Sequence, residues 1–198
     1  MKRVFALLTL IIFPALSSTV LADWDQAANM ATARDSFAAA LIGDEIYVFG
    51  GNGNPDQLNL GGGEKYSIAS NSWVGIADHL DYADLPHPAG VEEICGASLN
   101  GKFYVFGAWG DDPDDNYDSK NLNFNYVYDP STDTWSQLAD KLTLTAGPEI
   151  SVYNDKIYIF GGFGGDDETD RTEVEAYDPS TDSWQFVTNM PRQLELVS

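Results

Sequence analysis

The stretch that decides the fold is Ile46-Tyr47-Val48-Phe49-Gly50-Gly51, a short β-branched and aromatic run that ends on two glycines. The same pattern returns as Phe103-Tyr104-Val105-Phe106-Gly107-Ala108 and as Ile157-Tyr158-Ile159-Phe160-Gly161-Gly162. Such runs favour β-strands, and the glycines predict a close backbone approach that a Cβ would block. Three copies indicate an internal repeat, and the fold follows from it.

A second element follows each copy and consists of a tyrosine, a turn and a tryptophan. Residues 128–135 read Tyr-Asp-Pro-Ser-Thr-Asp-Thr-Trp, residues 177–184 nearly repeat them, and residues 66–73 are a diverged version. The tryptophans of this element are Trp73, Trp135 and Trp184, and Trp24 precedes them at a similar spacing. We interpret these aromatic side chains as packing between repeats rather than as a stripe that binds a ligand.

Each copy predicts four short strands joined by turns. The predicted ranges are 36–42, 45–49, 65–68 and 72–76, then 94–99, 102–106, 123–128 and 134–138, then 149–153, 156–160, 173–177 and 183–187. Two-residue turns such as Asn100-Gly101 join the first two strands of each copy. Because successive antiparallel strands alternate in direction, the long loops after the second strand and between copies fall on one face. We expect binding residues on that face.

This combination of di-glycine, Tyr-Asp-Pro turn and spaced tryptophan resembles the kelch repeat, one copy of which forms a four-stranded blade of a β-propeller. The resemblance implies an all-β fold with three four-stranded blades, at about residues 31–76, 90–138 and 147–187. Residues 23–30 would be the last strand of a preceding blade, and residues 188–198 the start of an incomplete next one. The repeat residues are Gly50, Gly51, Gly107, Gly161, Gly162, Trp24, Trp73, Trp135 and Trp184.

Three blades are fewer than a closed propeller needs, since closure typically takes four to eight. Three explanations stand at this point, and the favoured one is that the sequence is a fragment of a longer reading frame. If Ser198 is the true C-terminus, two copies could close a six-bladed ring head to tail as a homodimer. A degenerate gene without a stable product is the third explanation.

Residues 1–22 have the organisation of a secretory signal peptide. Lys2 and Arg3 precede an apolar run, 4–13, that is too short to span a bilayer, and a cleavage site is predicted after Ala22. An N-terminal membrane anchor is the alternative. No later stretch is apolar enough to cross a membrane, so we expect the mature protein to be periplasmic or secreted with no membrane span.

The charge balance limits the partners. Lys and Arg total 10 against 31 Asp and Glu, a formal net charge of −21. Nucleic acid and anionic membrane surfaces would be repelled, which excludes nucleic-acid binding. The single cysteine, Cys95, excludes a disulfide scaffold within the chain and is expected to be a small buried side chain.

Two acidic loops raise the question of a metal ion. The first contains Asp111, Asp112 and Asp114, and the second contains Asp166 and Asp167. Clustered carboxylates suit Ca²⁺, although neither loop has the spacing of an EF-hand. Solvated acidity that aids solubility is the alternative, and no other cofactor is expected.

Four residues are candidates for ligand binding. Trp109 and Tyr117 lie in the first acidic loop, where they would form a stacking platform for a sugar, although Trp109 could also fill space between blades. Arg34 precedes an innermost strand and could hold a carboxylate or a sugar hydroxyl, with pairing to a neighbouring aspartate as the alternative. Arg171 is a candidate of the same type.

Two functions from different classes follow. The first is a secreted or periplasmic binding or scaffold propeller that uses its long-loop face to bind a protein or a carbohydrate, since no catalytic motif is present. The alternative is a sugar-active enzyme such as the sialic-acid mutarotases, which also occur among secreted kelch-like propellers. Such an enzyme needs an acid–base pair, to which Arg34 with Glu92 or Glu93 would contribute.

Overall fold

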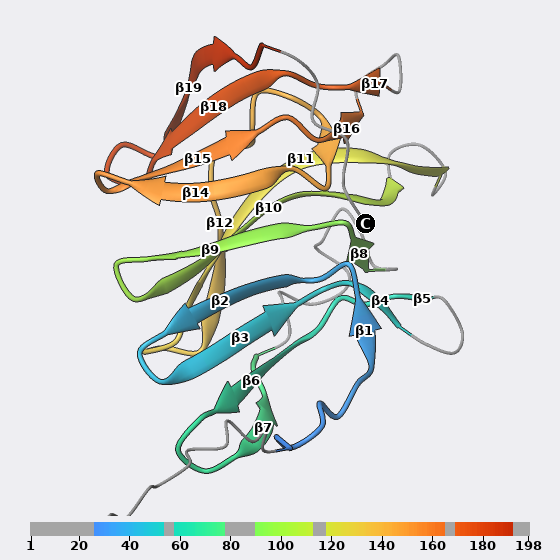
Figure 1. Ribbon diagram of the computed structural model, residues 1–198, viewed down its shortest axis with the longest axis vertical. Coiled ribbons are helices and arrows are strands. Elements are labelled where there is room, and N and C mark those ends of the chain that lie inside the picture. Colours follow the sequence, from blue (N-terminus) through green and yellow to red (C-terminus); the bar gives the residue numbers. More distant parts are fainter. Residues whose placement is uncertain (1–25, 54–57, 78–89, 113–117, 165–168, 192–198) are drawn as a thin grey trace, which may run out of the picture.

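A computed structural model of the chain describes residues 26–53, 58–77, 90–112, 118–164 and 169–191. The described part contains strands, turns and connections but no helix (Figure 1). It accordingly holds no helix that could cross a membrane.

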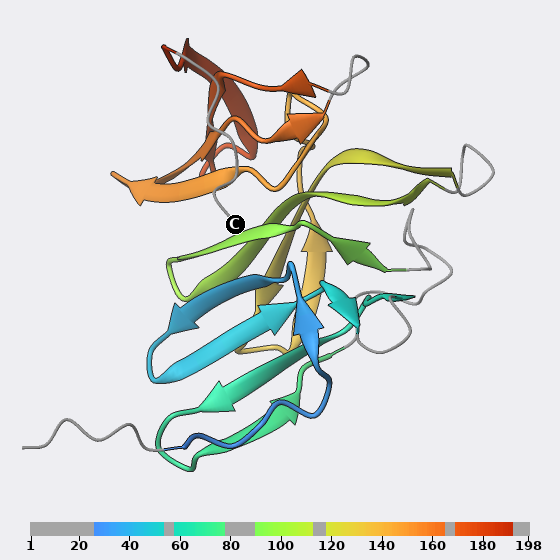
Figure 2. The same ribbon diagram turned by 45° about the vertical axis from the view of Figure 1, so that its right-hand side comes forward.

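Three antiparallel sheets follow one another along the chain and are stacked side by side (Figures 1 and 2). The first and third have four strands each, and the second has a fifth, short strand beside its four main ones. The four main strands of each sheet lie in sequence order, as the repeat predicts, and we call these units blades 1, 2 and 3. Blade 1 consists of β2 (Ala38–Ile42), β3 (Glu45–Phe49), β6 (Gly63–Ser67) and β7 (Ser72–Gly75). Blade 2 consists of β9 (Cys95–Leu99), β10 (Lys102–Asp112), β11 (Asp118–Asp129) and β12 (Thr134–Gln137). Blade 3 consists of β14 (Glu149–Tyr153), β15 (Lys156–Phe160), β18 (Glu173–Asp178) and β19 (Ser183–Asn189).

The long-loop face contains short strands that the sequence pattern did not predict. In blade 1, β1 (Arg34–Asp35), β4 (Asn52–Gly53) and β5 (Leu58–Asn59) form a small separate sheet. In blade 3, β13 (Thr145–Ala146), β16 (Phe163–Gly164) and β17 (Thr169–Asp170) form the corresponding sheet. In blade 2, β8 (Val91–Glu92) pairs with the extended β10. Short pairings therefore hold much of this face in place.

Blade 2 departs from the other two because its second and third strands continue far beyond the blade. Gly50 and Gly51 have φ values of 70° and 93°, and Gly161 and Gly162 have 61° and 100°, so both chains leave the sheet there. At the corresponding pair in blade 2, Gly107 has a positive φ of 48° but Ala108 does not, and strand pairing resumes at Ala108 after a bulge. A residue with a Cβ avoids the positive φ that the second glycine adopts. The predicted loop 108–122 is therefore largely a hairpin arm, which projects past the blade in Figure 2.

Aromatic and aliphatic side chains fill the two spaces between blades. Tyr47 and Phe49 of blade 1 pack against Tyr128 and Trp135 of blade 2, with 4.6 Å between the ring centroids of Phe49 and Trp135. The same arrangement joins blades 2 and 3, where Phe106 contacts the rings of Tyr177 and Trp184. The recurring aromatic residues thus pack the blades, as the sequence predicts. Trp24 lies outside the described residues.

A repeated set of hydrogen bonds, which we call the clamp, attaches each blade to the chain segment before it. In blade 2, Asp133 accepts hydrogen bonds from the hydroxyl of Tyr128 and from the backbone N–H of Ala77, the latter at 2.8 Å. The indole N–H of Trp135 donates to the carbonyl of Ala77 at 3.0 Å. Both backbone groups of one residue from the preceding blade are therefore held.

The clamp occurs three times with the same geometry. In blade 1, Asn71 and Trp73 hold Ala28, at 2.7 Å and 2.8 Å. In blade 3, Asp182 and Trp184 hold Ala139, at 2.9 Å and 2.7 Å. In each case the residue held lies four positions after a tryptophan of the preceding repeat.

A lysine is buried between blades 2 and 3. Lys141 has 2% of its surface exposed, and its ammonium donates hydrogen bonds to the backbone carbonyl of Thr143 and, at 2.6 Å, to Thr145 Oγ1. Burial lowers the pKa of Lys141 to about 8, while the nearby carboxylate of Glu175 opposes the shift. Its neighbours along the chain, Leu142 and Leu144, are exposed.

The first prediction concerns the clamp. Asp133→Ala removes the acceptor of two hydrogen bonds and should lower the free energy of unfolding by about 1–3 kcal/mol. Chemical denaturation followed by tryptophan fluorescence measures the change. Asp44→Ala, in an exposed hairpin turn, is the matched control and should have little effect. Equal stability of the two variants would show that the clamp contributes nothing.

The second prediction concerns pH. The pKa of Lys141 is lowered on folding, so its protonated form weakens the fold, and this penalty disappears as the pH rises above about 8. The unfolding free energy of the wild type minus that of Lys141→Met should therefore increase by about 1–2 kcal/mol between pH 7.5 and 9.5.

Comparing the wild type with Lys141→Met separates the effect of Lys141 on stability from that of other groups, which lower the stability as the pH rises. Burial raises the pKa of Cys95 to about 12 and that of Tyr177 above its usual range, so both weaken the fold at alkaline pH. These contributions cancel in the difference. Lys102→Met, on an exposed side chain, serves as the control. A difference that does not vary with pH contradicts the prediction.

Candidate functional site

The candidate site lies on the long-loop face, where three short pairings bring polar and aromatic residues into line. Trp109 in the hairpin arm of β10 is directly opposite Glu92 of β8 on one side and Asn121 of β11 on the other. Directly opposite residues of antiparallel strands place their side chains on the same face of the sheet, about 5 Å apart at Cβ. A carboxylate, an indole and an amide therefore form a row across three strands.

The row extends toward both neighbouring blades. At the blade 1 end, Asn52 Nδ2 donates a hydrogen bond to Glu92 Oε2 at 2.9 Å. At the blade 3 end, the side chain of Asn121 lies against Gly164, where an added Cβ would come 2.6 Å from Asn121 Cγ. We call Asn52, Glu92, Trp109 and Asn121 the loop-face row. All three blades meet along it.

The members of the row differ in burial and hydrogen bonding. Trp109 and Glu92 are partly exposed, whereas Asn121 is buried. The amide oxygen of Asn121 has no hydrogen-bond partner among the described residues. A buried acceptor without a donor is costly, so a ligand hydroxyl or N–H that reached it would be favoured. A stacking ring with nearby fixed polar groups suits a ligand that carries hydroxyl groups.

Glu93 follows the row directly and has an unusual backbone conformation. Its φ is 52°, and the corresponding residues of blades 1 and 3, Ser36 and Gly147, have φ values of 52° and 55°. The carbonyl of Glu93 accepts a hydrogen bond from the N–H of Gly147 at 2.7 Å. Partial burial and the neighbouring Glu92 raise the pKa of its carboxyl group. Non-glycine residues with positive φ often lie at functional sites.

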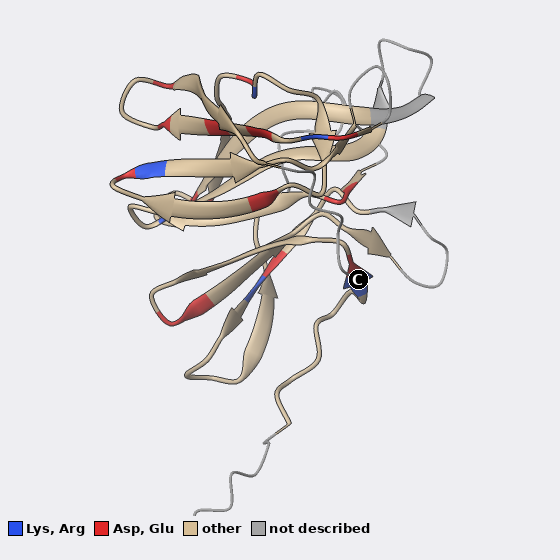
Figure 3. Ribbon diagram, turned by 45° about the horizontal axis from the view of Figure 1, so that its top comes forward, with Lys and Arg blue, Asp and Glu red and all other residues tan. Residues whose placement is uncertain are grey.

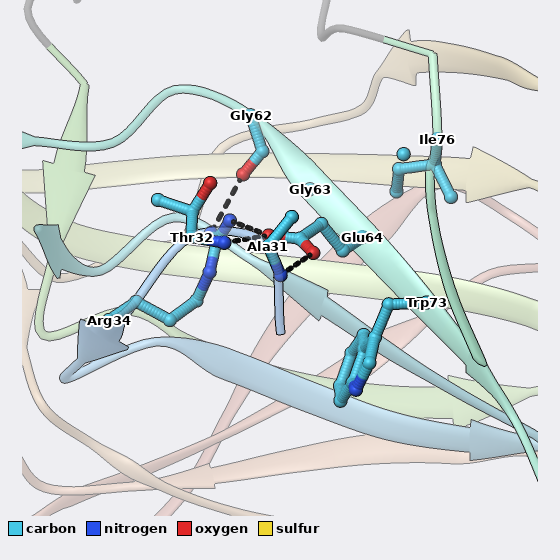
Figure 4. Close-up of a pocket in the computed structure, with 9 residues that line it drawn as sticks. Ala31, Thr32, Arg34, Gly62, Gly63, Glu64, Trp73 and Ile76 are labelled. Atoms are coloured by element: carbon cyan, nitrogen blue, oxygen red, sulfur yellow. Dashed lines mark hydrogen bonds and ion pairs between the residues drawn. The ribbon is translucent and has the colours of Figure 1, made fainter. Parts of the chain in front are cut away.

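Arg34 does not face the loop surface but lies in the interior of blade 1 (Figure 4). Its side chain is 3% exposed, and its guanidinium donates hydrogen bonds to the carbonyls of Gly50 and Gly62 and forms an ion pair with Glu64 at 3.1 Å. The alternative of ion pairing is thus the one realised, with a glutamate in place of the expected aspartate. These contacts use the guanidinium within blade 1, and a role of Arg34 in ligand binding stays a prediction from the sequence.

A pocket of about 300 Å³ lies beside this ion pair and is lined by Thr32, Glu64, Trp73 and Ile76 among others (Figure 4). The backbone N–H groups of Ala31 and Thr32 also donate to the Glu64 carboxylate, at 2.9 Å and 3.1 Å. Arg34 and Glu64 therefore anchor the segment that enters blade 1.

Arg171 lies at the blade 3 end of the row. Its Nε donates to the carbonyl of Gly164 at 2.9 Å, and Gly164 is the residue that Asn121 contacts. The structure thus brings Trp109 and Arg171 to the same region, on either side of Asn121. Tyr117 lies outside the described residues.

The acidic loops contribute little that can be described. The backbones of Asp111 and Asp112 pair with Ser119 and Asp118 in the hairpin arm. Asp114, Asp166 and Asp167 fall outside the described ranges. Among the residues that the structure does describe, no group of three or more His, Cys, Asp or Glu could hold a metal ion. The calcium site stays a prediction from the sequence.

Sequence reasoning did not single out Asn52 and Asn121. Both lie in stretches that read as irregular loops, and an isolated asparagine in a loop carries no signal of its own. Their positions beside Glu92 and Trp109 follow from the strand register of the hairpin arm. The one sequence feature that could have suggested this arm is Ala108, which replaces the second glycine of the repeat.

The comparisons with known proteins agree with the repeat pattern. Residues 9–195 match the KLHDC2/KLHL20/DRC7 Kelch-repeats domain. Kelch repeat and BTB domain-containing protein 12 of Homo sapiens is 30% identical over 174 residues, covering 81% of this chain and 26% of the relative. Kelch-like protein terF of Aspergillus terreus is 29% identical, covering 80% of this chain and 34% of the relative. Kelch-like protein 23 of Pongo abelii is 25% identical, covering 85% of this chain and 27% of the relative.

A solved structure shares the fold. The structure of YjhT superposes with a TM-score of 0.68 at 24% sequence identity, covering 85% of this chain and 56% of that one. The chain therefore spans about a third or less of these curated relatives and little more than half of the solved structure. With a match that covers nearly all of its residues, the chain belongs to the kelch-repeat family.

Proposed function

We propose that this chain is a binding module, part of an extracytoplasmic kelch propeller, that recognises a protein or glycan ligand through its loop-face row. The observation that carries the proposal is the alignment of Glu92, Trp109 and Asn121 across three paired strands. A rigid scaffold that presents an aromatic ring between hydrogen-bonding groups is a common design for recognition.

The charge of the molecule narrows the ligand. Acidic residues exceed basic ones by 21, and their excess is visible along the described ribbon (Figure 3). An anionic ligand would meet unfavourable long-range electrostatics, whereas a neutral sugar or a basic peptide would not. Glu92 and the amide oxygen of Asn121 both accept hydrogen bonds, which suits the hydroxyls of a neutral glycan or the N–H groups of a peptide.

The third prediction tests the row. Trp109→Ala should weaken binding to a neutral oligosaccharide panel by about ten-fold, because stacking on the indole is lost. Isothermal titration calorimetry against the best binder of the panel measures the change. Phe186→Ala, which removes an exposed aromatic ring from an outer strand away from the row, is the control.

Two other results of this binding experiment would change the proposal. Unchanged affinity of Trp109→Ala for a sugar that the wild type binds would place the ligand elsewhere. Binding of a basic peptide but of no oligosaccharide, with the same loss in Trp109→Ala, would assign the row to protein recognition.

A sugar-active enzyme is the second candidate, and the raised pKa of Glu93 beside Glu92 is the observation that favours it. A carboxyl group that stays protonated to higher pH can act as a general acid. Arg34 forms an ion pair with Glu64, so this candidate rests on Glu93 alone among the groups of the expected acid–base pair.

The fourth prediction separates the two candidates. A binding module should leave the rate of anomer exchange of free sugars, followed by NMR, at the value of buffer alone. Acceleration that Glu93→Gln abolishes, while the variant keeps the stability of the wild type, would establish catalysis instead.

A further inference from the structure

Blades 2 and 3 each place a tyrosine of the third strand in contact with a tryptophan of the fourth. In blade 2, Tyr128 is directly opposite Trp135, and the centroids of their rings are 5.1 Å apart. In blade 3, Tyr177 is directly opposite Trp184, with 5.0 Å between the ring centroids. Rings at this separation touch. An electron can therefore pass from the phenol to the indole without an intermediate group.

The hydroxyl group of each tyrosine donates a hydrogen bond to the clamp aspartate of its blade. Tyr128 donates to Asp133 Oδ1, and Tyr177 donates to Asp182 Oδ1 at 2.7 Å. Both tyrosines are buried, so the aspartate is the proton acceptor next to each hydroxyl. The hydrogen bond from Tyr128 lowers the pKa of Asp133, which is therefore ionised at neutral pH and ready to accept a proton.

The two tryptophans have no base beside them. The indole N–H of Trp135 donates to the backbone carbonyl of Ala77, and that of Trp184 donates to the carbonyl of Ala139. A backbone carbonyl accepts a hydrogen bond but is too weak a base to remove the proton. If Trp135 lost an electron, its ring would keep a positive charge inside the protein, where an unpaired charge is costly.

We propose that the clamp aspartates enable Tyr128 and Tyr177 to reduce the neighbouring tryptophan after a diffusible one-electron oxidant, such as a peroxide-derived radical, has attacked it. The oxidant takes one electron from Trp135. An electron then moves from Tyr128 to the indole radical cation, while the phenolic O–H bond breaks and its proton binds to the carboxylate of Asp133. The products are an intact indole, a tyrosyl radical and a carboxylic acid. All three are neutral, so no unpaired charge remains buried.

Between blades 1 and 2 the same arrangement continues toward the surface. The ring centroid of Tyr47 is 5.8 Å from that of Tyr128, and the hydroxyl of Tyr47 donates to Glu45 Oε2 at 2.7 Å. An electron from Tyr47 can therefore restore Tyr128, which recovers its proton from Asp133, while the proton of Tyr47 passes to Glu45. The carboxylate of Glu45 is partly exposed. The radical thus moves away from the packed tryptophan.

Blade 1 contains a natural comparison. The ring centroids of Tyr66 and Trp73 are 5.1 Å apart, as in blade 2, and the hydroxyl of Tyr66 donates at 2.7 Å to Oδ1 of Asn71. The geometry is the same, but an amide oxygen is not a base at neutral pH. The pair of blade 1 should therefore lack the proton acceptor that the other two pairs have. This activity is independent of the loop-face row and of its ligand.

The experiment is pulse radiolysis of the purified chain with the azide radical, a one-electron oxidant that prefers tryptophan. The tryptophan and tyrosyl radicals are followed by their separate absorption bands. In the wild type the first should convert to the second at a rate that does not depend on protein concentration. The double variant Asp133→Asn, Asp182→Asn keeps an oxygen at each clamp but no base, and should slow the conversion by about a hundred-fold.

Two further variants complete the test. Asp129→Asn is the matched control, because Asp129 lies in the same turn as Asp133 but binds Ser131 and Lys102 instead of a tyrosine, and it should leave the rate unchanged. Asn71→Asp gives the pair of blade 1 a proton acceptor and should raise the yield of tyrosyl radical. Circular dichroism of each variant confirms that the blades remain folded.

Three results would overturn the proposal. The first is an equal rate of conversion in the wild type and in the double variant. The second is a rate that rises with protein concentration, which would mean that the electron passes between molecules. The third is a yield of tyrosyl radical that Asn71→Asp leaves unchanged.

Discussion

The structure depends on the hydrogen bonds by which each blade holds one residue of the segment before it. A tryptophan N–H and an aspartate or asparagine oxygen capture both backbone groups of Ala28, Ala77 or Ala139. Apolar packing between sheets has little directional preference, because many offsets bury similar areas. The clamp supplies the direction, and since it recurs in each blade it sets the same offset each time. Without that regularity the short strands of three blades would not meet along one row.

A single methyl group then distinguishes the blade that carries the candidate site. Where blades 1 and 3 have a second glycine at high positive φ, blade 2 has Ala108, and its strands continue into the hairpin arm. The arm carries Trp109 into register with Glu92 and Asn121. The candidate site is thus a consequence of a departure from the repeat, which is consistent with functional positions breaking the rules that the rest of a fold obeys.

The sequence allowed us to predict those features that depend on residues close together in the chain. Strands β3, β14 and β15 begin and end where alternation and two-residue turns place them, and the aromatic residues pack between blades as their recurrence implies. The short strands β4, β8 and β16 were not predicted, because two residues carry no period and their pairing depends on distant partners. The same limit applies to Asn121, whose role appears only once its register with Trp109 is known, and to Arg34, whose partner Glu64 is thirty residues away.

The buried charges show how the repeat tolerates change between blades. Glu64 of blade 1 and Glu175 of blade 3 occupy equivalent positions, and each accepts a hydrogen bond from the backbone of the entering segment, at Ala31 and Leu142. In blade 1 the balancing cation is Arg34, whereas the equivalent residue in blade 3 is Thr145 and the cation is Lys141, four positions earlier. A buried carboxylate needs a positive partner nearby but not a particular one, because Coulomb attraction is less directional than a hydrogen bond. The arginine and the lysine therefore serve one structural purpose from different positions in the chain.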